Sequence, residues 1–252
     1  MPVFAILWPW IGLGAAGALL LVLFSTDGLQ ANRGASRWFD LPWLVWLALA
    51  ACLLHDFEAN GIDLRGVPYA VRGDLCRILG YRDAIACPVP LSFITATHVT
   101  AVWGAGGLAA LLAPRWPAMG LSFFALVLVK ALLPMAAAVM EGRYVPGLFT
   151  GCLVLVPLGL WTFSVALTRA GIARSVLGAV LAGAIAAPVI LAASLVAYLR
   201  DYIGLWPLVI VQVLNGFVPA GMVFAVLRRR GPPPPPPPRR KPKLRAVERE
   251  PN

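Results

Sequence analysis

The sequence predicts an all-α, polytopic membrane protein, a helix bundle with about seven spans. Two observations support this fold class: 60% of the 252 residues are hydrophobic and only 13% are charged, whereas about a quarter of a typical soluble domain is charged. The apolar residues also fall in long blocks, and a helix needs about 20 of them to cross a bilayer. The spans must be helical because lipid cannot satisfy unpaired backbone groups. Four cysteines are too few for a secreted disulfide scaffold.

Seven segments have the length and apolarity of a span. They lie near residues 3–24, 41–59, 91–113, 118–140, 147–168, 174–199 and 204–227. The first lacks a basic leader and a small-residue cleavage site, so we expect a retained helix rather than a signal peptide. The second is the shortest, and His55, Asp56 and Glu58 occupy its last turns. We expect one membrane-embedded domain over residues 1–230.

The net charge of +10 belongs mostly to the C-terminal end. Residues 228–252 hold nine Lys or Arg and two Glu, which gives +7. Seven prolines at 232–238 favour an extended polyproline II segment, so residues 231–252 are expected to form a disordered, basic, cytoplasmic tail. Its partners would be anionic lipid headgroups or a proline-binding module, because a basic run next to a span indicates membrane contact rather than nucleic acid.

The positive-inside rule places the C-terminus in the cytoplasm and, with seven spans, the N-terminus outside. The loop at 60–90 would then face an oxidising compartment. Its two cysteines, Cys76 and Cys87, are compatible with a disulfide and equally with two free thiols. The four arginines of this loop run against the rule.

Ionisable side chains inside a span cost about 2.5–3.5 kcal/mol each at the helix centre, so a functional reason for them is expected. His55 and Glu58 are three residues apart and project from one helix face. This pair is suited to acid–base chemistry, or to two ligands of a metal held between helices. A helix end that reaches interfacial water is the structural alternative. Asp56 is expected to point elsewhere, toward the headgroups.

His98 and Lys130 extend the candidate site. Antiparallel spans would place His98 at the depth of His55 and Glu58, and these three side chains are the predicted ligands of Zn²⁺ or Fe²⁺. The alternative for His98 is a hydrogen bond to a neighbouring helix. Lys130, in the middle of the fourth span, needs a carboxylate partner. The candidates are Glu58, Glu141 and Asp201, with Glu58 preferred because of its depth.

Two further groups of residues are expected to have structural roles. Gln212 and Asn215, three residues apart in the last span, are expected to form hydrogen bonds between helices. Most of the nine Trp lie near predicted span ends and are expected to anchor the interface.

Two stretches resemble a family of bacterial integral membrane proteins, the HXXEE family. Residues 54–59, Leu-His-Asp-Phe-Glu-Ala, are similar to its His-x-x-Glu-Glu signature, and residues 143–150 are similar to its Arg-Tyr-x-Pro-Gly-x-x-Thr segment. The resemblance covers about residues 41–168 and implies a divergent member in the bacterial inner membrane, because Ala59 stands where the family has its second Glu. The family has no assigned function, but its polar motif suggests an enzyme.

Three functions are compatible with this pattern. The first is a membrane-embedded enzyme that acts on a lipid-like or isoprenoid substrate, with His55, Glu58, His98 and Lys130 as its catalytic residues. The second is a small-solute or proton-coupled transporter that uses Lys130 and Glu58 as a relay. The third is a non-catalytic scaffold that works through the tail. The soluble-enzyme motifs of nucleotide, hydrolase and zinc-protease sites are absent from the sequence.

Overall fold

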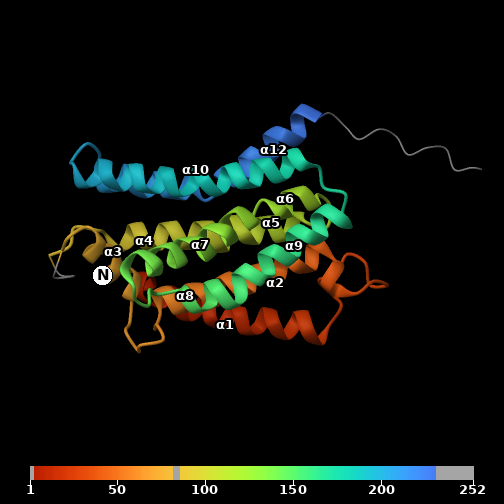
Figure 1. Ribbon diagram of the computed structural model, residues 1–252, viewed down its shortest axis with the longest axis horizontal. Helices are drawn as coiled ribbons and strands as arrows, with labels where there is room; N and C mark the ends of the chain where they lie inside the picture. Colours follow the sequence, from red (N-terminus) through yellow and green to blue (C-terminus); the bar gives the residue numbers. More distant parts are fainter. Residues whose placement is uncertain (1–2, 82–85, 231–252) are drawn as a thin grey trace, which may run out of the picture.

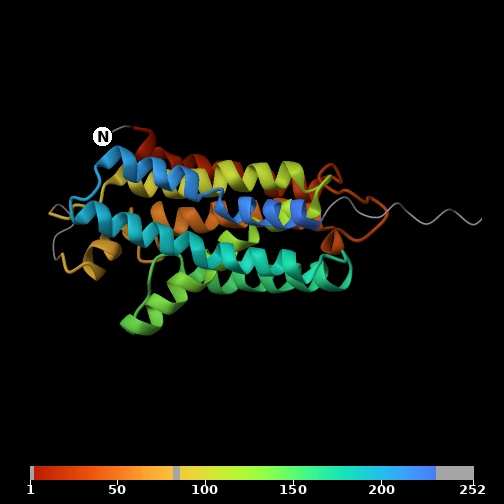
Figure 2. The same ribbon diagram turned by 90° about the horizontal axis from the view of Figure 1, so that it is seen from above.

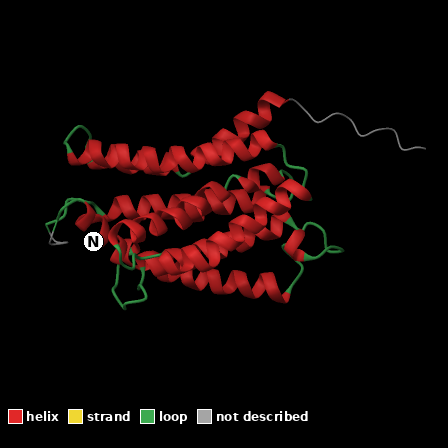
Figure 3. Ribbon diagram, viewed as in Figure 1, coloured by secondary structure: helices red, strands yellow, loops and turns green. Residues whose placement is uncertain are grey.

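The computed structural model describes residues 3–81 and 86–230 of the chain. Helices form the whole framework, and the described residues contain no β-strand beyond an isolated bridge between Ile62 and Pro68 (Figure 3). The predicted proline-rich tail at 231–252 and loop residues 82–85 lie outside the described part of the chain. The prediction of an all-α bundle is confirmed.

Six helical segments are long and apolar enough to cross a membrane. They are α1 (Phe4–Ser25), α2 (Leu41–Asn60), α4–η2–α5 (Leu91–Leu112), α6–α7 (Pro117–Glu141), α8–η3–α9 (Leu148–Thr168) and α10 (Arg174–Leu199). A seventh is broken into α11 (Leu205–Asn215) and α12 (Val218–Arg230), with a bend of 45°. Seven crossings result if this bent pair counts as one span, as the apolar blocks predict.

Helix α2 forms the centre of the bundle. In its most apolar stretch 78% of the residues are buried, against 22–33% in the other five long segments. Asp40 caps its start by accepting a hydrogen bond from the backbone N–H of Trp43 (3.0 Å), and Pro42 occupies the first turn. The small residues Ala48, Ala50 and Ala51 have less than 4% exposure, so neighbouring helices approach closely.

The helices lie in layers around α2. Helix α1 lies on one side of the bundle, α2, α8 and α9 come next, α4 to α7 follow, and α10 to α12 form the other side (Figure 1). The view from above shows the spans running along the same long axis (Figure 2). The N-terminus and α3 (Ala70–Ile78) lie at one end of this axis, and α12 leads to the other end (Figure 1). We call the first the α3 end.

Two spans contain π-helical turns. The segment η2 (Val99–Gly106) follows His98 directly, and η3 (Gly151–Leu155) follows Thr150. A π-helix widens the turn and shifts the side chains that flank it, and such turns are frequent at functional sites. Each π-helical turn thus begins directly after a polar side chain, His98 or Thr150.

The loop at the α3 end is closed by a disulfide. Cys76 in α3 is bonded to Cys87, which precedes α4. Of the two possibilities that the sequence left open, the disulfide is therefore the one that forms. Cys52 and Cys152 are free, and Cys52 is buried in α2 as a small core residue.

Candidate functional site

The last turns of α2 carry three buried polar residues. His55, Asp56 and Glu58 are exposed by only 3%, 1% and 6%. His55 and Glu58 share contacts with Thr150 on one side of the helix, as their spacing predicts, whereas Asp56 contacts Lys130 and His98 on another. The prediction that Asp56 points toward the headgroups is wrong, because its carboxylate is buried between three helices.

Glu58 accepts four hydrogen bonds across the start of α8 (Leu148–Thr150). Its Oε1 accepts from the Tyr144 hydroxyl (2.7 Å) and the Phe149 N–H (3.1 Å). Its Oε2 accepts from the N–H of Thr150 (2.8 Å) and from the Thr150 hydroxyl (2.5 Å). The carboxylate thus satisfies the unpaired N–H groups of a helix start inside the membrane, where a negative charge is favoured. Glu58 fixes the α8 segment to α2.

His55 is held in one tautomer by the same group. Its Nδ1 lies 2.9 Å from Thr150 Oγ1. The single hydroxyl proton of Thr150 is donated to Glu58, so His55 Nδ1 must carry the proton of the second bond. Its Nε2 is then an unprotonated acceptor, with no hydrogen-bond partner among the described residues.

Gly147 makes room for the imidazole. Its φ is +86°, in the left-handed region that favours glycine, and it precedes α8. A Cβ at this position would lie 2.6 Å from His55 Cε1 and 3.1 Å from Nε2. The Pro-Gly turn therefore reverses the chain and also lets the backbone pack against the Cε1–Nε2 edge of His55.

A second network joins α2, α4 (Leu91–His98) and α7 (Phe124–Glu141). Asp56 Oδ1 forms an ion pair with Lys130 Nζ and lies 2.7 Å from His98 Nδ1, and Lys130 Nζ lies 3.1 Å from the same nitrogen. Trp8 of α1 stacks on the His98 ring, with 5.7 Å between the ring centroids. Trp8 is 2% exposed, so it is a core residue and not the interface anchor that was expected.

The partner of Lys130 is therefore Asp56, and the preference for Glu58 is wrong. Glu58 is occupied by the start of α8, on a different side of α2. An unpaired ammonium in the bilayer interior is costly, and the buried Asp56 carboxylate compensates its charge. The second oxygen of Asp56, Oδ2, is buried and has no hydrogen-bond partner among the residues that the structure describes.

The predicted metal ligands are not assembled. His55 and Glu58 meet through Thr150, whereas His98 belongs to the network of Asp56 and Lys130. Within residues 3–81 and 86–230, no group of three His, Cys, Asp or Glu side chains has an arrangement that could hold a metal ion. The described geometry gives the predicted Zn²⁺ or Fe²⁺ site no support.

One cavity connects the two networks. It has a volume of about 450 Å³, and His55, His98 and Lys130 all line it. The rest of the wall is mostly apolar and comes from α3, α4, α7, α10 and the broken last span. Pro134 and Pro188, which lie inside α7 and α10, contribute to it. Three of the four predicted site residues thus share one chamber, and Glu58 lies behind its wall.

The loop between α2 and α3 covers this region from the α3 end. The Arg65 guanidinium lies 5.2 Å from the centre of the Tyr144 ring, and Asp63 accepts hydrogen bonds from Arg65 and from the Val67 N–H. Burial and the hydrogen bond to Glu58 raise the pKa of Tyr144 above its ordinary value. Tyr144 therefore remains a donor to Glu58 at every physiological pH.

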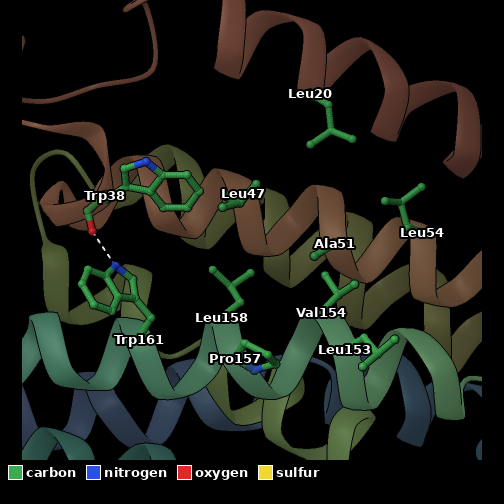
Figure 4. A pocket seen from close by; sticks show the side chains of 10 residues that line it. All are labelled: Leu20, Trp38, Leu47, Ala51, Leu54, Leu153, Val154, Pro157, Leu158 and Trp161. Atoms are coloured by element: carbon green, nitrogen blue, oxygen red, sulfur yellow. Dashed lines mark hydrogen bonds between the residues drawn. The ribbon is translucent and has the colours of Figure 1, made fainter.

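A second hollow lies on the other side of α2 and is entirely apolar. It has a volume of about 610 Å³ between α1, α2 and α9 (Val156–Thr168), and its side chains carry no ionisable group. Figure 4 shows Leu20, Leu54 and Val154 pointing into it, with the indole N–H of Trp161 donating to the Trp38 carbonyl at one end (2.7 Å).

The residues that the sequence analysis missed are Asp56, as an interior group, and Thr150 and Trp8. Thr150 stood in the quoted motif, but an isolated threonine in an apolar segment gives no signal of its own. For Asp56 the available signal was the need of Lys130 for a carboxylate at similar depth.

Comparison with known families supports the resemblance seen in the sequence. A family model described as "Protein of unknown function with HXXEE motif" matches residues 46–162. The match contains both quoted stretches, and the structure brings them into contact through Glu58, Tyr144 and Thr150. No curated protein and no solved structure matches the chain significantly.

Proposed function

We propose that this chain, whose residues 46–162 match a family of unassigned function, is a membrane-embedded enzyme that acts on a lipid-like substrate. The observation that carries the proposal is that His55, His98 and Lys130 face one largely apolar cavity of about 450 Å³. Cavities of this size and character suit a small amphiphile. The apolar part of the substrate would occupy the chamber, and its polar group would meet the three basic side chains.

His55 is the acid–base residue in this proposal. Its Nε2 is free to accept a proton, while its Nδ1–H is held by Thr150, which is in turn held by Glu58. Orientation of an imidazole by a hydrogen bond to its second nitrogen is the arrangement that general bases use. Lys130 and His98 would orient the polar group of the substrate, and Glu58 acts as a positioning residue.

The most direct test is conversion of lipids by the purified chain. Wild-type protein in nanodiscs is incubated with a total bacterial lipid extract, and the lipids are analysed by mass spectrometry. We expect at least one lipid-like species to change mass with the wild type and to remain unchanged with His55→Gln. Leu181→Phe is the control, because Leu181 is 52% exposed on α10 and lies away from the cavity.

Other outcomes of this test favour the alternatives. Unchanged lipids together with a pH-dependent solute flux that Lys130→Met abolishes would indicate the transporter. A cellular function lost only on deletion of residues 231–252 would indicate the scaffold that acts through its tail. Conversion that persists in His55→Gln would contradict the catalytic assignment.

We also propose that the protein lies in a bacterial inner membrane with the α3 end outside and the tail in the cytoplasm. The disulfide between Cys76 and Cys87 belongs to an oxidising compartment and lies at the α3 end. Arg33, Arg115 and Arg174 lie in or next to connections at the opposite end, where the last turn of α12 begins the basic run with Arg228 and Arg229. That run would contact anionic headgroups or a proline-binding module. The substrate would then enter the cavity from the outer side of the membrane.

A further inference from the structure

The wall of the cavity that the last span contributes contains a second polar group. Gln212 and Asn215 belong to α11 and line the same cavity as His55 and Lys130. They are 1% and 6% exposed. A buried amide inside the membrane is costly unless its hydrogen bonds are satisfied, so its bonds have to be counted.

The donors of this pair are used within the protein. The side-chain N–H of Asn215 donates to the Ala187 carbonyl (2.9 Å), and that of Gln212 donates to the Ser194 hydroxyl (2.7 Å). These bonds also fix the orientation of both amides. Gln212 Oε1 receives only a long contact from Asn215 Nδ2 (3.4 Å).

The side-chain oxygen of Asn215 accepts no hydrogen bond from the described residues. Its Oδ1 is buried without a hydrogen-bond partner in the part of the chain that the structure describes. Most buried side-chain acceptors are paired, so this oxygen calls for a partner that the described residues do not supply, and it belongs to a residue of the cavity wall.

The backbone breaks at the same place. Helix α11 ends at Asn215, and α12 begins at Val218 with a bend of 45°. Gly216, between the two helices, and Pro219, in the first turn of α12, line the cavity. Irregular backbone at membrane depth is tolerated where it lines a polar cavity or is buried in protein. A Cβ on Gly216 would lie 3.1 Å from the Ala101 backbone nitrogen, so the break is packed tightly against η2. The break between α11 and α12 thus forms a tightly packed part of the cavity wall.

We propose that Asn215 Oδ1 is a specificity contact for the ligand, which therefore carries a hydroxyl or an amide N–H. This inference rests on the proposed function, because it takes the same cavity as the ligand site, but it requires binding and not catalysis. It selects a hydroxylated or amide-bearing lipid over a pure hydrocarbon or an ester lipid without a donor. A ligand without a donor would leave Oδ1 unpaired.

The experiment compares two probes of the same size. Saturable binding of farnesol and of farnesyl methyl ether, which lacks the donor, is measured with the full chain in nanodiscs. We expect the wild type to bind the alcohol about tenfold more tightly than the ether, as one hydrogen bond to a buried acceptor would give. In Asn215→Leu the ratio should fall to about one.

The controls separate this inference from misfolding and from the proposed function. Ser194→Ala disturbs the same polar cluster without touching Asn215 and should keep the preference, and Asn215→Ala should lose it without added bulk. The preference is a ratio of two binding affinities and requires no conversion, so a wild type that keeps the preference but converts no lipid would contradict the proposed function and leave this inference intact. Equal binding of both probes by the wild type, or a preference that survives both Asn215 variants, would overturn it.

Discussion

At the scale of single residues, His55 depends on a hydroxyl that belongs to another span. Thr150 Oγ1 accepts a hydrogen bond from the Nδ1–H of His55 and donates one through its own hydroxyl to Glu58 Oε2. Three residues from two helices therefore act as one unit. The two halves of the family's sequence pattern are kept together by this contact and not by closeness in the chain.

Replacement of Thr150 by Val tests this unit. The variant keeps the shape of the side chain but leaves the His55 Nδ1–H and one Glu58 bond without a partner, so we expect a loss of about 1–3 kcal/mol in the free energy of unfolding. We also expect lipid conversion to fall by up to about 100-fold, which is the lower end of what a general base itself contributes, because Thr150 acts only by orienting His55. Thr150→Ser retains the hydroxyl and should retain most activity. Equal loss of activity in both variants would contradict the role of the Thr150 hydroxyl between His55 and Glu58.

The ion pair of Asp56 and Lys130 gives a second prediction at this scale. Lys130→Met leaves a carboxylate buried without its counter-charge and should cost about 3–5 kcal/mol, measured by unfolding in mild detergent. The double variant Lys130→Met, Asp56→Asn removes both charges and should be more stable than Lys130→Met alone. Additive losses would show that the two residues do not form a pair in the membrane.

At the scale of elements, the loop from Gly61 to Tyr69 links the membrane site to the aqueous phase. Burial by itself would raise the pKa of Asp63, but the Val67 N–H, Arg65 and the Arg65 backbone N–H outweigh it, so the pKa lies below its ordinary value. A carboxyl group with a lowered pKa stabilises the folded loop above its unfolded pKa of about 3.9, and this stability is lost as the pH falls through the lower folded pKa.

The protection of the amides of residues 61–69 against hydrogen exchange should therefore be high near neutral pH. It should fall in acid, when each measured rate is compared with the slower intrinsic exchange rate at that pH. In Asp63→Asn, the amides of this loop should already exchange quickly at neutral pH, and their protection should no longer depend on pH. The Leu64 N–H, which donates to the Tyr144 hydroxyl (3.5 Å), should lose its protection in the same opening. A wild-type loop whose protection does not change with pH would contradict this role of Asp63.

The elements also show which features a sequence can predict. Hydropathy located the spans, with α10 at 174–199 as expected, because each apolar block must leave water for lipid or protein whichever helices lie beside it. The three-residue spacing placed His55 and Glu58 together, because that geometry is local to one helix. The pairing of Lys130 with Asp56 could not be read from spacing, because it depends on how α2, α4 and α7 pack. The break after Asn215 had a local signal in Gly216 and Pro219, which the continuous hydropathy of the segment obscured.

At the scale of the whole molecule, the orientation in the membrane decides from which side a substrate arrives. In a background without Cys52 and Cys152, an impermeant maleimide should label Tyr202→Cys in intact spheroplasts, because Tyr202 is 81% exposed between α10 and α11 at the α3 end. Asp27→Cys, in the connection at the opposite end, should be labelled only after permeabilisation. The reverse pattern would place the cavity toward the cytoplasm.

The central claim is that a lipid-like molecule occupies the chamber faced by His55, His98 and Lys130. Native mass spectrometry of the purified chain measures this occupancy directly. We expect the wild type and Leu181→Trp, which adds bulk on the lipid-facing side of α10, to retain the same small amphiphile. Ala137→Trp, which fills the cavity from α7, should lose it while unfolding at a similar temperature. Retention of that molecule by Ala137→Trp, or its absence from the wild type, would contradict the claim.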